Sequence, residues 1–275
     1  MTAAPTLLDR ILGPDGLTVV FQPVLQRTRG GWRLHALEGL SRGPRDTNVR
    51  AADVLFEYVR RRHVEDVVDR ECITRVLRAA RELPGTPRVT VNAHASTLGR
   101  DLGFLPFFEE VLRQTGIPPQ RVVVEIVEKS PVWDDDQLRQ VLDGLRALGS
   151  SIALDDVGLG QSNMKMILEC QPDYFKVDRY LVAGSSTDFY RRALLKSLSD
   201  LAGSVGARVV AEGIEEYEDL STVLSEGITL VQGFLLARPM SPGELIASGL
   251  LSGEEIELDV RARTGQALPT PPPAA

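Results

Sequence analysis

Residues 17–42 read LTVVFQPVLQRTRGGWRLHALEGLSR, and this stretch decides the fold. It contains two apolar, β-branched runs, Leu17–Leu25 and Leu34–Arg42, joined by Gln26–Arg33. This connection contains Gly30-Gly31 and is too short for a crossover helix, so the two strands should pair antiparallel. The sheet is therefore expected to begin with a reversed strand.

Beyond residue 42, strand patterns alternate with amphipathic helix patterns. Strands are predicted at Arg88–Asn92, Arg121–Val127, Ser151–Asp156, Tyr174–Asp178, Arg208–Glu212 and Leu230–Leu236. Helices are predicted at Asp53–Glu82, Phe104–Gly116, Asp134–Gly149, Asn163–Glu169, Thr187–Gly206 and Tyr217–Gly227. The alternation indicates an α/β protein, a (β/α)8 TIM-like barrel whose first strand runs antiparallel to the rest. An open doubly wound sheet is the alternative, but no Gly-x-Gly-x-x-Gly opens a helix after a strand.

The chain divides into one domain with short extensions. Residues 1–16 are expected to form an N-terminal lead-in and residues 17–258 the barrel domain. Residues 259–275 are polar and rich in proline, so a disordered tail is expected there. The sequence shows no internal repeat and no second domain.

Composition excludes several classes of protein. A chain of 275 residues with 43% hydrophobic and 25% charged residues is typical of a soluble globular protein. Its apolar stretches are far shorter than the ~18 to 20 residues of a membrane span, and no signal-peptide core is seen, so a cytoplasmic location is expected. The net charge of −7 disfavours duplex nucleic acid as a partner. Cys72 and Cys170 lack the spacing of a metal site and are expected to be core or helix-face residues.

Polar side chains interrupt the apolar pattern at or near the ends of seven successive strands. They are Glu38, Asn92, Glu125, Asp155-Asp156, Lys176-Val177-Asp178, Glu212 and Gln232. The carboxyl ends of barrel strands form one face, which holds the active site in nearly all such enzymes. Carboxylates gathered there would repel one another unless cations neutralised them. Oxygen ligands suit Mg²⁺ or Mn²⁺, so we expect two divalent metal ions and displacement chemistry at phosphorus, with Lys176 orienting the attacking water.

Eight short motifs occur in the order and spacing of a known family. They are Phe21-Gln22-Pro23-Val24, Glu38-Gly39-Leu40, Val91-Asn92, Glu125-Ile126-Val127-Glu128, Asp155-Asp156-Val157-Gly158-Leu159-Gly160, Lys176-Val177-Asp178, Ala211-Glu212-Gly213-Ile214-Glu215 and Gln232-Gly233-Phe234. Over roughly residues 15–245, the chain closely resembles the EAL-domain cyclic di-GMP phosphodiesterases. The resemblance implies two divalent metals, hydrolysis of cyclic di-GMP to linear pGpG, and a homodimer formed through helices near the loop after the fifth strand.

The resemblance also implies a role for each matching residue. One metal would be held by Glu38, Asn92, Glu125 and Asp155. The other would be held by Asp155, Asp156 and Glu212. Near the attacking water the family pattern puts Lys176 and Gln232, and on the substrate side it puts Arg42 and Gln22. Glu128 matches the glutamate that anchors the loop after the fifth strand.

The sequence departs from the family pattern in three places. Gly39 replaces the alanine of the motif that names the family, a change expected to be tolerated. Ser41-Arg42-Gly43 stands where Leu-Arg-Trp is common, which keeps the arginine and loses its apolar flank. The loop Val157–Met164 keeps its glycines and differs at most other positions, which puts catalytic rate and dimer coupling in doubt.

Three functions remain open from the sequence. The first is a metal-dependent cyclic di-GMP phosphodiesterase. The second is an EAL-type receptor that binds cyclic di-GMP and signals through a regulatory protein partner. The third is an unrelated barrel enzyme, such as a Schiff-base aldolase that uses Lys176. His94 follows Asn92 by two residues and should point to the same side of the strand, although a plain loop histidine is expected ahead of a substrate contact.

Overall fold

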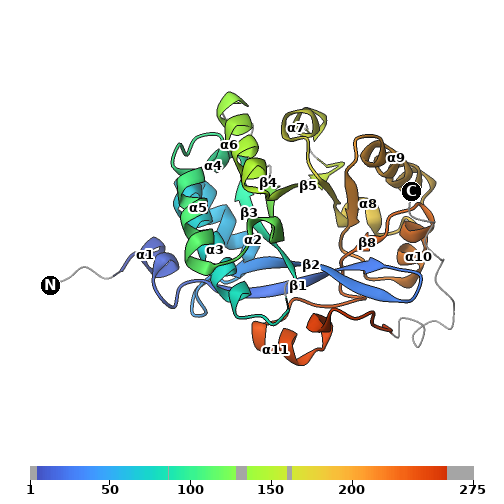
Figure 1. Cartoon of the computed structure of the whole chain (residues 1–275), viewed down its shortest axis with the longest axis horizontal. Coiled ribbons are helices and arrows are strands. Elements are labelled where there is room, and N and C mark those ends of the chain that lie inside the picture. The colour runs from blue at the N-terminus through green and yellow to red at the C-terminus, as the bar shows by residue number, and fades with distance from the viewer. Residues whose placement is uncertain (1–4, 86, 128–134, 160–162, 259–275) are drawn as a thin grey trace.

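The strands close into one barrel in the computed structural model, which describes residues 5–85, 87–127, 135–159 and 163–258 (Figure 1). In barrel order they are β1 (Thr18–Arg27), β2 (Trp32–Arg42), β3 (Arg88–His94), β4 (Val122–Val127), β5 (Ser151–Val157), β6 (Tyr174–Val177), β7 (Arg208–Ala211) and β8 (Leu230–Val231). β1 pairs antiparallel with both β2 and β8, and the neighbouring pairs from β2 to β8 are parallel. The predicted TIM-like barrel with a reversed first strand is confirmed. Glu128 and the predicted tail lie outside the described residues.

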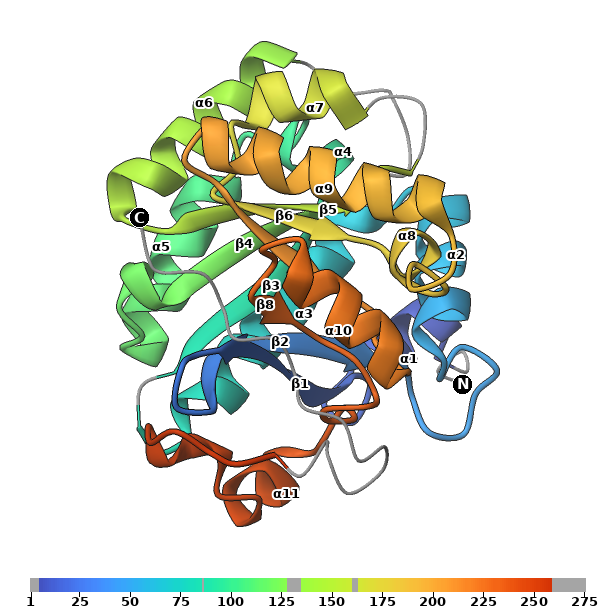
Figure 2. The same ribbon diagram turned by 90° about the vertical axis from the view of Figure 1, so that its right-hand side faces the viewer.

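Helices cover the outside of the barrel (Figures 1 and 2). They are α1 (Leu7–Leu12), α2 (Ala52–Arg62), α3 (Glu65–Arg81), α4 (Ala95–Leu98), α5 (Phe104–Thr115), α6 (Asp135–Leu148), α7 (Asn163–Cys170), α8 (Arg179–Val182), α9 (Phe189–Ser204), α10 (Tyr217–Ser225) and α11 (Pro242–Ala247). The segment before α11 returns to β1, where Phe21 and Met240 exchange backbone hydrogen bonds. The reversed strand is thereby covered although no crossover helix follows it.

The single helix predicted over Asp53–Glu82 is wrong, because the chain breaks it into α2 and α3. His63 ends α2 in the left-handed conformation, with φ of 55°, and its backbone N–H donates to the carbonyl of Arg60. Between Val59 and Val67 the only apolar residue is Val64, so the apolar spacing lapses at the break. The charged run that interrupts it, residues 60–63, also suits an exposed helix face, and the single-helix prediction passed over it.

Two apolar regions hold the barrel together. The larger one lies between the strands and the surrounding helices and includes Phe21, Phe104, Phe108 and Phe175. A smaller one consists of Val24, Ala36, Val123, Ala153, Tyr174, Val210 and Leu230, contributed by seven of the strands. This second set alternates with residues of the outer core along each strand, so it fills the barrel interior.

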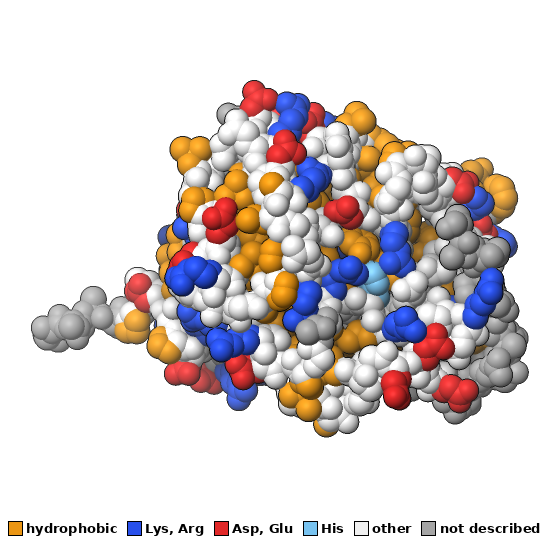
Figure 3. Space-filling view, viewed as in Figure 1, with side chains coloured by type: hydrophobic (Ala, Val, Ile, Leu, Met, Phe, Trp, Pro, Cys, Tyr) orange, Lys and Arg blue, Asp and Glu red, His pale blue; other side chains and the backbone are white. Residues whose placement is uncertain are grey.

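Other expectations concern the surface and the cysteines. Cys72 and Cys170 are both buried, as predicted. In the part of the chain that the structure describes, no helix is both long and apolar enough to cross a bilayer. The face seen in Figure 3 mixes basic and acidic side chains around exposed apolar atoms, so no surface of a single charge sign extends across it.

Candidate active site

Strand alternation builds a polar ring at one end of the barrel. Side chains two residues apart on a strand point to the same face. Ala36 in the barrel interior therefore aligns with Glu38, and Val123 aligns with Glu125. Each of these strands places an apolar side chain inside the barrel and a polar one at its mouth. This mouth ring comprises Gln22, Glu38, Asn92, Glu125, Asp155, Lys176, Glu212 and Gln232.

Lys176 lies at the centre of the mouth ring. Its Nζ is 2.5 Å from Glu125 Oε1 and 2.6 Å from Glu212 Oε1. The same atom is 3.5 Å from Glu38 Oε1 and 3.6 Å from Asp155 Oδ1. The lysine side chain is only 4% exposed, so these charges interact with little screening by water. Four carboxylates thus surround one buried ammonium group.

The electrostatics of the ring follow from this excess of negative charge. Burial raises the pKa of Glu125 well above its usual range, and it raises the pKa of Glu212 to about 8, although Lys176 opposes both shifts. Burial alone would lower the pKa of Lys176, but the neighbouring carboxylates outweigh it and hold that pKa well above its usual range. Without further cations, the ring retains protons that exposed carboxylates would have lost.

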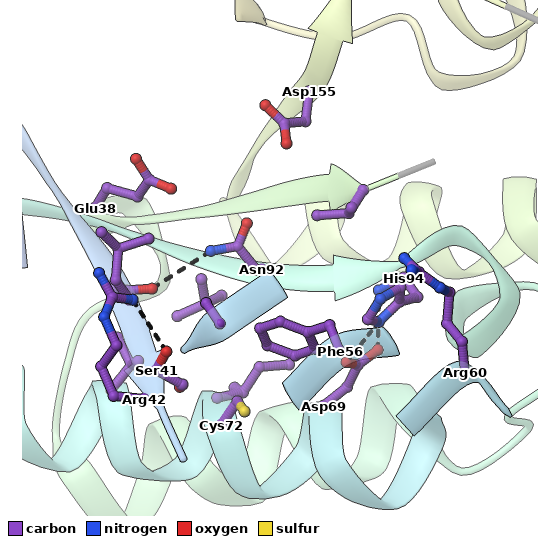
Figure 4. A pocket seen from close by; sticks show the side chains of 17 residues that line it. Glu38, Ser41, Arg42, Phe56, Arg60, Asp69, Cys72, Asn92, His94 and Asp155 are labelled. Carbon is purple, nitrogen blue, oxygen red and sulfur yellow. Dashed lines mark hydrogen bonds and ion pairs between the residues drawn. The ribbon is translucent and has the colours of Figure 1, made fainter. Parts of the chain in front are cut away.

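The remaining ring members contact the protein through hydrogen bonds. Gln232 Nε2 donates to Glu38 Oε2 at 2.6 Å. Gln22 Nε2 donates to the carbonyl of Ala237 at 3.3 Å, and Asn92 Nδ2 donates to the carbonyl of Gly39 at 3.4 Å. Figure 4 shows Asn92 between Glu38 and His94, with Asp155 on the opposite side of the opening. The Asn92 amide therefore turns its nitrogen to the backbone, which leaves its oxygen for another partner.

Arg42 lies at the end of β2, on the rim of the opening. Its Nη1 donates to the carbonyl of Ser41 at 3.1 Å, and the side chain lines the cleft beside Glu38 (Figure 4). The strand extends four residues past Glu38, beyond the point where the apolar pattern stops. Pairing with the long strand β1 accounts for this extension, since Thr18 is opposite Arg42.

Asp156 differs from the other predicted ligands. It has a φ of 52°, in the left-handed region, and the β5–β6 register shifts between Leu154 and Val157. Among the described residues, Asp155 lines the cleft and Asp156 does not. The strand is therefore distorted at the point where the sequence puts two adjacent carboxylates.

The chemistry of the mouth ring fits divalent metal ions. Three buried oxygens, Glu125 Oε2, Asp155 Oδ1 and Gln232 Oε1, have no hydrogen-bond partner. Buried oxygens that lack a hydrogen bond are costly, and hard cations such as Mg²⁺ and Mn²⁺ favour oxygen ligands. Among the described residues, however, no three acidic, histidine or cysteine side chains already stand in metal-ligand geometry. Metal binding would therefore require these carboxylates to leave Lys176 in part.

The cleft at the barrel mouth has two arms that share Glu38, Leu40 and Asp155. The α2 arm, with a cavity of about 160 Å³, runs from Glu38 under helix α2 (Figure 4). The β8 arm, about 300 Å³, is lined by the lysine end of the ring together with Arg179 and Phe234. The two carboxylates at the junction thus face ligands in either arm.

Sequence reasoning missed the α2 arm. Phe56 and Arg60 of α2 and Asp69 of α3 line it, and none of them was predicted to belong to the site. His94 is not a loop residue: it ends β3, it is buried, and its Nδ1 lies 2.8 Å from Asp69 Oδ1. Asp69 is a charged residue at a position that the apolar pattern of the helix predicts to be buried. Such a carboxylate needs a buried partner, and this was the signal from which the pair could have been predicted.

A family model described as EAL domain matches residues 7–239. The cyclic di-GMP phosphodiesterase NbdA of Pseudomonas aeruginosa is 29% identical over 238 residues, which are 85% of this chain and 30% of NbdA. The chain thus spans less than a third of that relative.

Solved structures agree with the fold. Klebsiella pneumoniae BlrP1 in a calcium/cyclic di-GMP complex has a TM-score of 0.74 and 28% identity, covering 88% of this chain and 59% of that one. The Xanthomonas citri FimX EAL domain in complex with cyclic di-GMP also has a TM-score of 0.74, with 85% and 91% covered. At 19% identity, this second likeness shows the fold alone.

Proposed function

Because the chain belongs to the EAL domain family, we propose that it hydrolyses cyclic di-GMP to linear pGpG with the aid of two divalent metal ions. The observation that carries the proposal is the cluster of four carboxylates within 3.6 Å of the buried Lys176 ammonium. This excess of buried negative charge needs cations to balance it, and an anionic phosphodiester could approach the ring only after metal ions had neutralised it. The named activity of NbdA and the cyclic di-GMP bound to BlrP1 support the same substrate.

The metal ligands are proposed on the family pattern. Glu38, Asn92, Glu125 and Asp155 would hold one ion, while Asp155, Asp156 and Glu212 would hold the other. Mg²⁺ and Mn²⁺ both suit these oxygens. Such ions supply a water of lowered pKa and neutralise charge on the phosphate. Asp156 must turn toward Asp155 for this arrangement, and Glu128, which lies outside the described residues, is proposed to anchor the loop that carries this movement.

The other groups bind and orient the reactants. In the metal-free protein the surrounding carboxylates hold the pKa of Lys176 well above its usual range, so the lysine keeps its proton there. Its proposed role in the reaction is to donate a hydrogen bond to the attacking water. Gln232 donates to Glu38 and offers its buried Oε1 to the same water. Arg42, on the rim, pairs with a phosphate oxygen, and Gln22 contacts the substrate from β1. Glu38 and Glu212 would help to hold the metal ions, whose charge would favour attack of water on the phosphate.

The raised pKa of Lys176 counts against a Schiff-base aldolase. A lysine that attacks a carbonyl must lose its proton near neutral pH, which burial among cations or apolar groups would favour. Lys176 is instead surrounded by carboxylates that retain its proton. The aldolase hypothesis therefore has the wrong electrostatic environment.

An EAL-type receptor that binds cyclic di-GMP and signals through a protein partner is the second candidate. The observation in its favour concerns Asp156. Strand β5 is distorted at this residue, and Asp156 is not among the described residues that line the cleft. A chain that held only one metal would bind the dinucleotide and turn it over poorly.

A homodimer is also proposed. Exposed apolar side chains on α7, α8 and α9 support a contact surface near the loop after β5. They are Met164, Leu168, Tyr180, Phe189 and Tyr190, each at least 62% exposed. Exposed large apolar side chains that form a contiguous patch are typical of protein interfaces.

The test is incubation of the pure protein with cyclic di-GMP and Mg²⁺ or Mn²⁺, followed by chromatography for pGpG. Repeated turnover supports the enzyme. Tight binding without product selects the receptor, and absence of both binding and product contradicts the proposed function.

A further inference from the structure

The end of the barrel opposite the mouth ring carries two arginines on the interior faces of its strands. Side chains two residues apart on a strand share a face, so Arg88 lies on the same face of β3 as Thr90 and Asn92. Arg208 likewise lies on the same face of β7 as Val210, which fills the barrel interior. Both arginines are the first residues of their strands. The interior therefore runs from carboxylates at the mouth to arginines at the other end.

A tyrosine and a histidine lie beside these arginines. Tyr174 pairs with Arg208 in the β6–β7 register, and the two side chains interact. The Tyr174 hydroxyl also lies 3.2 Å from His35 Nε2, and the two ring centroids are 5.6 Å apart. On the other side, His35 precedes Ala36, which pairs with Arg88. We call Arg88, Arg208, Tyr174 and His35 the basic end of the barrel.

The two arginines have no carboxylate to neutralise them in the part of the chain that the structure describes. None of the ion pairs found there includes Arg88 or Arg208. Asp173 precedes Tyr174 and so points to the opposite face of the strand, where its Oδ2 accepts a hydrogen bond from the Ile152 backbone N–H at 2.7 Å. Burial lowers the pKa of Arg208, and the charge of Arg88 lowers it further. The two cations are therefore partly desolvated and repel each other.

The basic end can be reached from outside the barrel. Arg88, Arg208 and His35 are each partly exposed, whereas Tyr174 is buried. The cavity between Tyr174 and Lys176 measures about 20 Å³, which is room for one water molecule. A larger ligand must therefore bind on the outer side of the tyrosine, where the arginines reach solvent. On the face seen in Figure 3, Lys and Arg side chains lie around a histidine near the centre.

The donors of the basic end suit a phosphate group with two negative charges. An arginine guanidinium presents a planar fork that matches two phosphate oxygens, and its charge-assisted hydrogen bonds are stronger than neutral ones. Two such forks need an anion with at least three free oxygens. A phosphate dianion has them, whereas a carboxylate or a phosphodiester has two free oxygens and one charge. The neutral imidazole of His35 can add a further N–H donor.

We propose that the basic end binds a phosphate dianion between Arg88 and Arg208, either inorganic phosphate or the terminal group of a phosphomonoester. The anion takes the place of the missing carboxylate and relieves the repulsion between the two cations. The site lies at the opposite end of the barrel from the mouth ring, so the inference does not rest on the proposed function.

The experiment measures phosphate binding by calorimetry, with the whole protein freed of metal by EDTA in a buffer without phosphate or sulfate. Metal removal matters because divalent ions at the mouth ring would attract phosphate there. Wild type should bind one equivalent of inorganic phosphate, and Arg88→Met and Arg208→Met should each weaken the affinity by about tenfold or more. Methyl phosphate is titrated in parallel. Binding of both ligands assigns the site to phosphomonoesters, and binding of inorganic phosphate alone assigns it to the free ion.

Arg33 provides a matched control at the same end of the barrel. It lies near the start of β2, its side chain is 56% exposed, and it pairs with Glu255 at 3.8 Å. Arg33→Met therefore removes the same charge from the protein but leaves Arg88 and Arg208 in place, and it should keep the wild-type affinity. Arg88→Lys keeps the charge and loses the fork, so it should also weaken binding and serves if Arg88→Met folds poorly.

Three results would overturn the inference. The first is no binding to wild type at phosphate concentrations up to about 10 mM. The second is wild-type affinity in the Arg88 and Arg208 variants. The third is equal weakening in Arg33→Met and Arg88→Met, which would show a response to net charge alone. None of these results bears on hydrolysis of cyclic di-GMP, so the proposed function stands or fails separately.

Discussion

Lys176 is the residue on which the charge balance of the mouth ring depends. Its ammonium contacts Glu125 and Glu212 directly and lies near two further carboxylates. Removing one partner of a buried charge cluster leaves the other charges without compensation. The lysine should therefore stabilise the metal-free protein, a role separate from its proposed contact with the attacking water.

Lys176→Met tests this stabilising role. The variant should lose about 3 kcal/mol in the absence of metal, because the glutamates that it leaves must then bind protons or repel one another. Divalent cations should restore much of this loss. Thermal melts with and without Mg²⁺ check the expectation: the Mg²⁺-induced rise in Tm should be larger in the variant than in wild type, and an equal rise would contradict it.

Glu38 tests the metal-ligand assignment. Glu38→Ala should lower kcat more than about a hundredfold, since it removes a carboxylate at the junction of the two arms. Glu38→Gln is the matched variant, because its amide oxygen can still accept from Gln232 Nε2 while the charge is lost. Both variants should fold, and relief of carboxylate repulsion should keep the metal-free Tm at or above the wild-type value. More than a tenth of wild-type kcat in either variant at saturating Mn²⁺ would rule Glu38 out as a ligand.

At the scale of the elements, the close packing of β2 against helix α3 explains why position 39 is a glycine. A Cβ at this position would lie 2.2 Å from Val76 Cγ1 and 3.0 Å from the carbonyl oxygen of Thr90. Val76 of α3 thus occupies the space that an alanine at position 39 would need. The glycine that replaces the alanine of the family motif therefore allows β2 and α3 to pack closely. Glu38 remains in the mouth ring.

Gly39→Ala should therefore destabilise the protein by about 1–3 kcal/mol through overpacking. Combining it with Val76→Ala should recover most of that loss relative to Val76→Ala alone, because the blocking methyl groups are gone. Chemical denaturation of the wild type, both single variants and the double variant measures this coupling. Additive free energies of unfolding would show that the two positions do not interact.

Sequence patterns predicted most elements because each strand carries a period of two and most helices carry a period near 3.6. They failed where one backbone dihedral angle decides the outcome. His63 ends α2 with a positive φ, and Asp156 distorts β5 in the same way. They also failed for partners that are distant in sequence, such as Asp69 and His94, since no local pattern records which buried charges will meet.

On the scale of the whole molecule, the barrel interior contains His35, a residue to which no function was assigned from the sequence. Val24 is opposite Ala36 and Leu25 is opposite Leu34, so His35 is the extra residue of a β-bulge. Its Nε2 lies 3.2 Å from the hydroxyl of Tyr174. Burial, together with the charges of Arg208 and Arg88, lowers the pKa of His35 to about 3.

This histidine should make the barrel sensitive to acid. The unfolded chain protonates His35 near pH 6.5, whereas the folded chain does so only near pH 3, so folding stability falls as the pH drops through this window, by at most about 1.4 kcal/mol per pH unit. His35→Gln should flatten the dependence of unfolding free energy on pH between 6 and 4. His63→Asn, at an exposed position, is the control and should keep the wild-type slope. An unchanged slope in His35→Gln would contradict the assignment.

The sequence predicted which residues gather at the barrel mouth better than it predicted how their side chains pair in the absence of metal. Glu38, Glu125 and Glu212 come together with Lys176 as the strand ends indicate, because parallel strands in register must present their carboxyl ends on one face. The sequence could not show that Lys176 would take the centre of the ring, since that depends on side-chain charge balance across four strands.

The central claim is that this cleft cleaves cyclic di-GMP through the carboxylates of the mouth ring. The most direct measurement is the rate of pGpG formation at saturating Mn²⁺ by wild type and by Asp155→Asn, a variant that keeps the side-chain shape at the junction of the two arms. The account predicts repeated turnover by wild type and a rate lower by about a hundredfold or more in Asp155→Asn, with the fold retained. No pGpG from wild type, or equal rates from the two proteins, would contradict it.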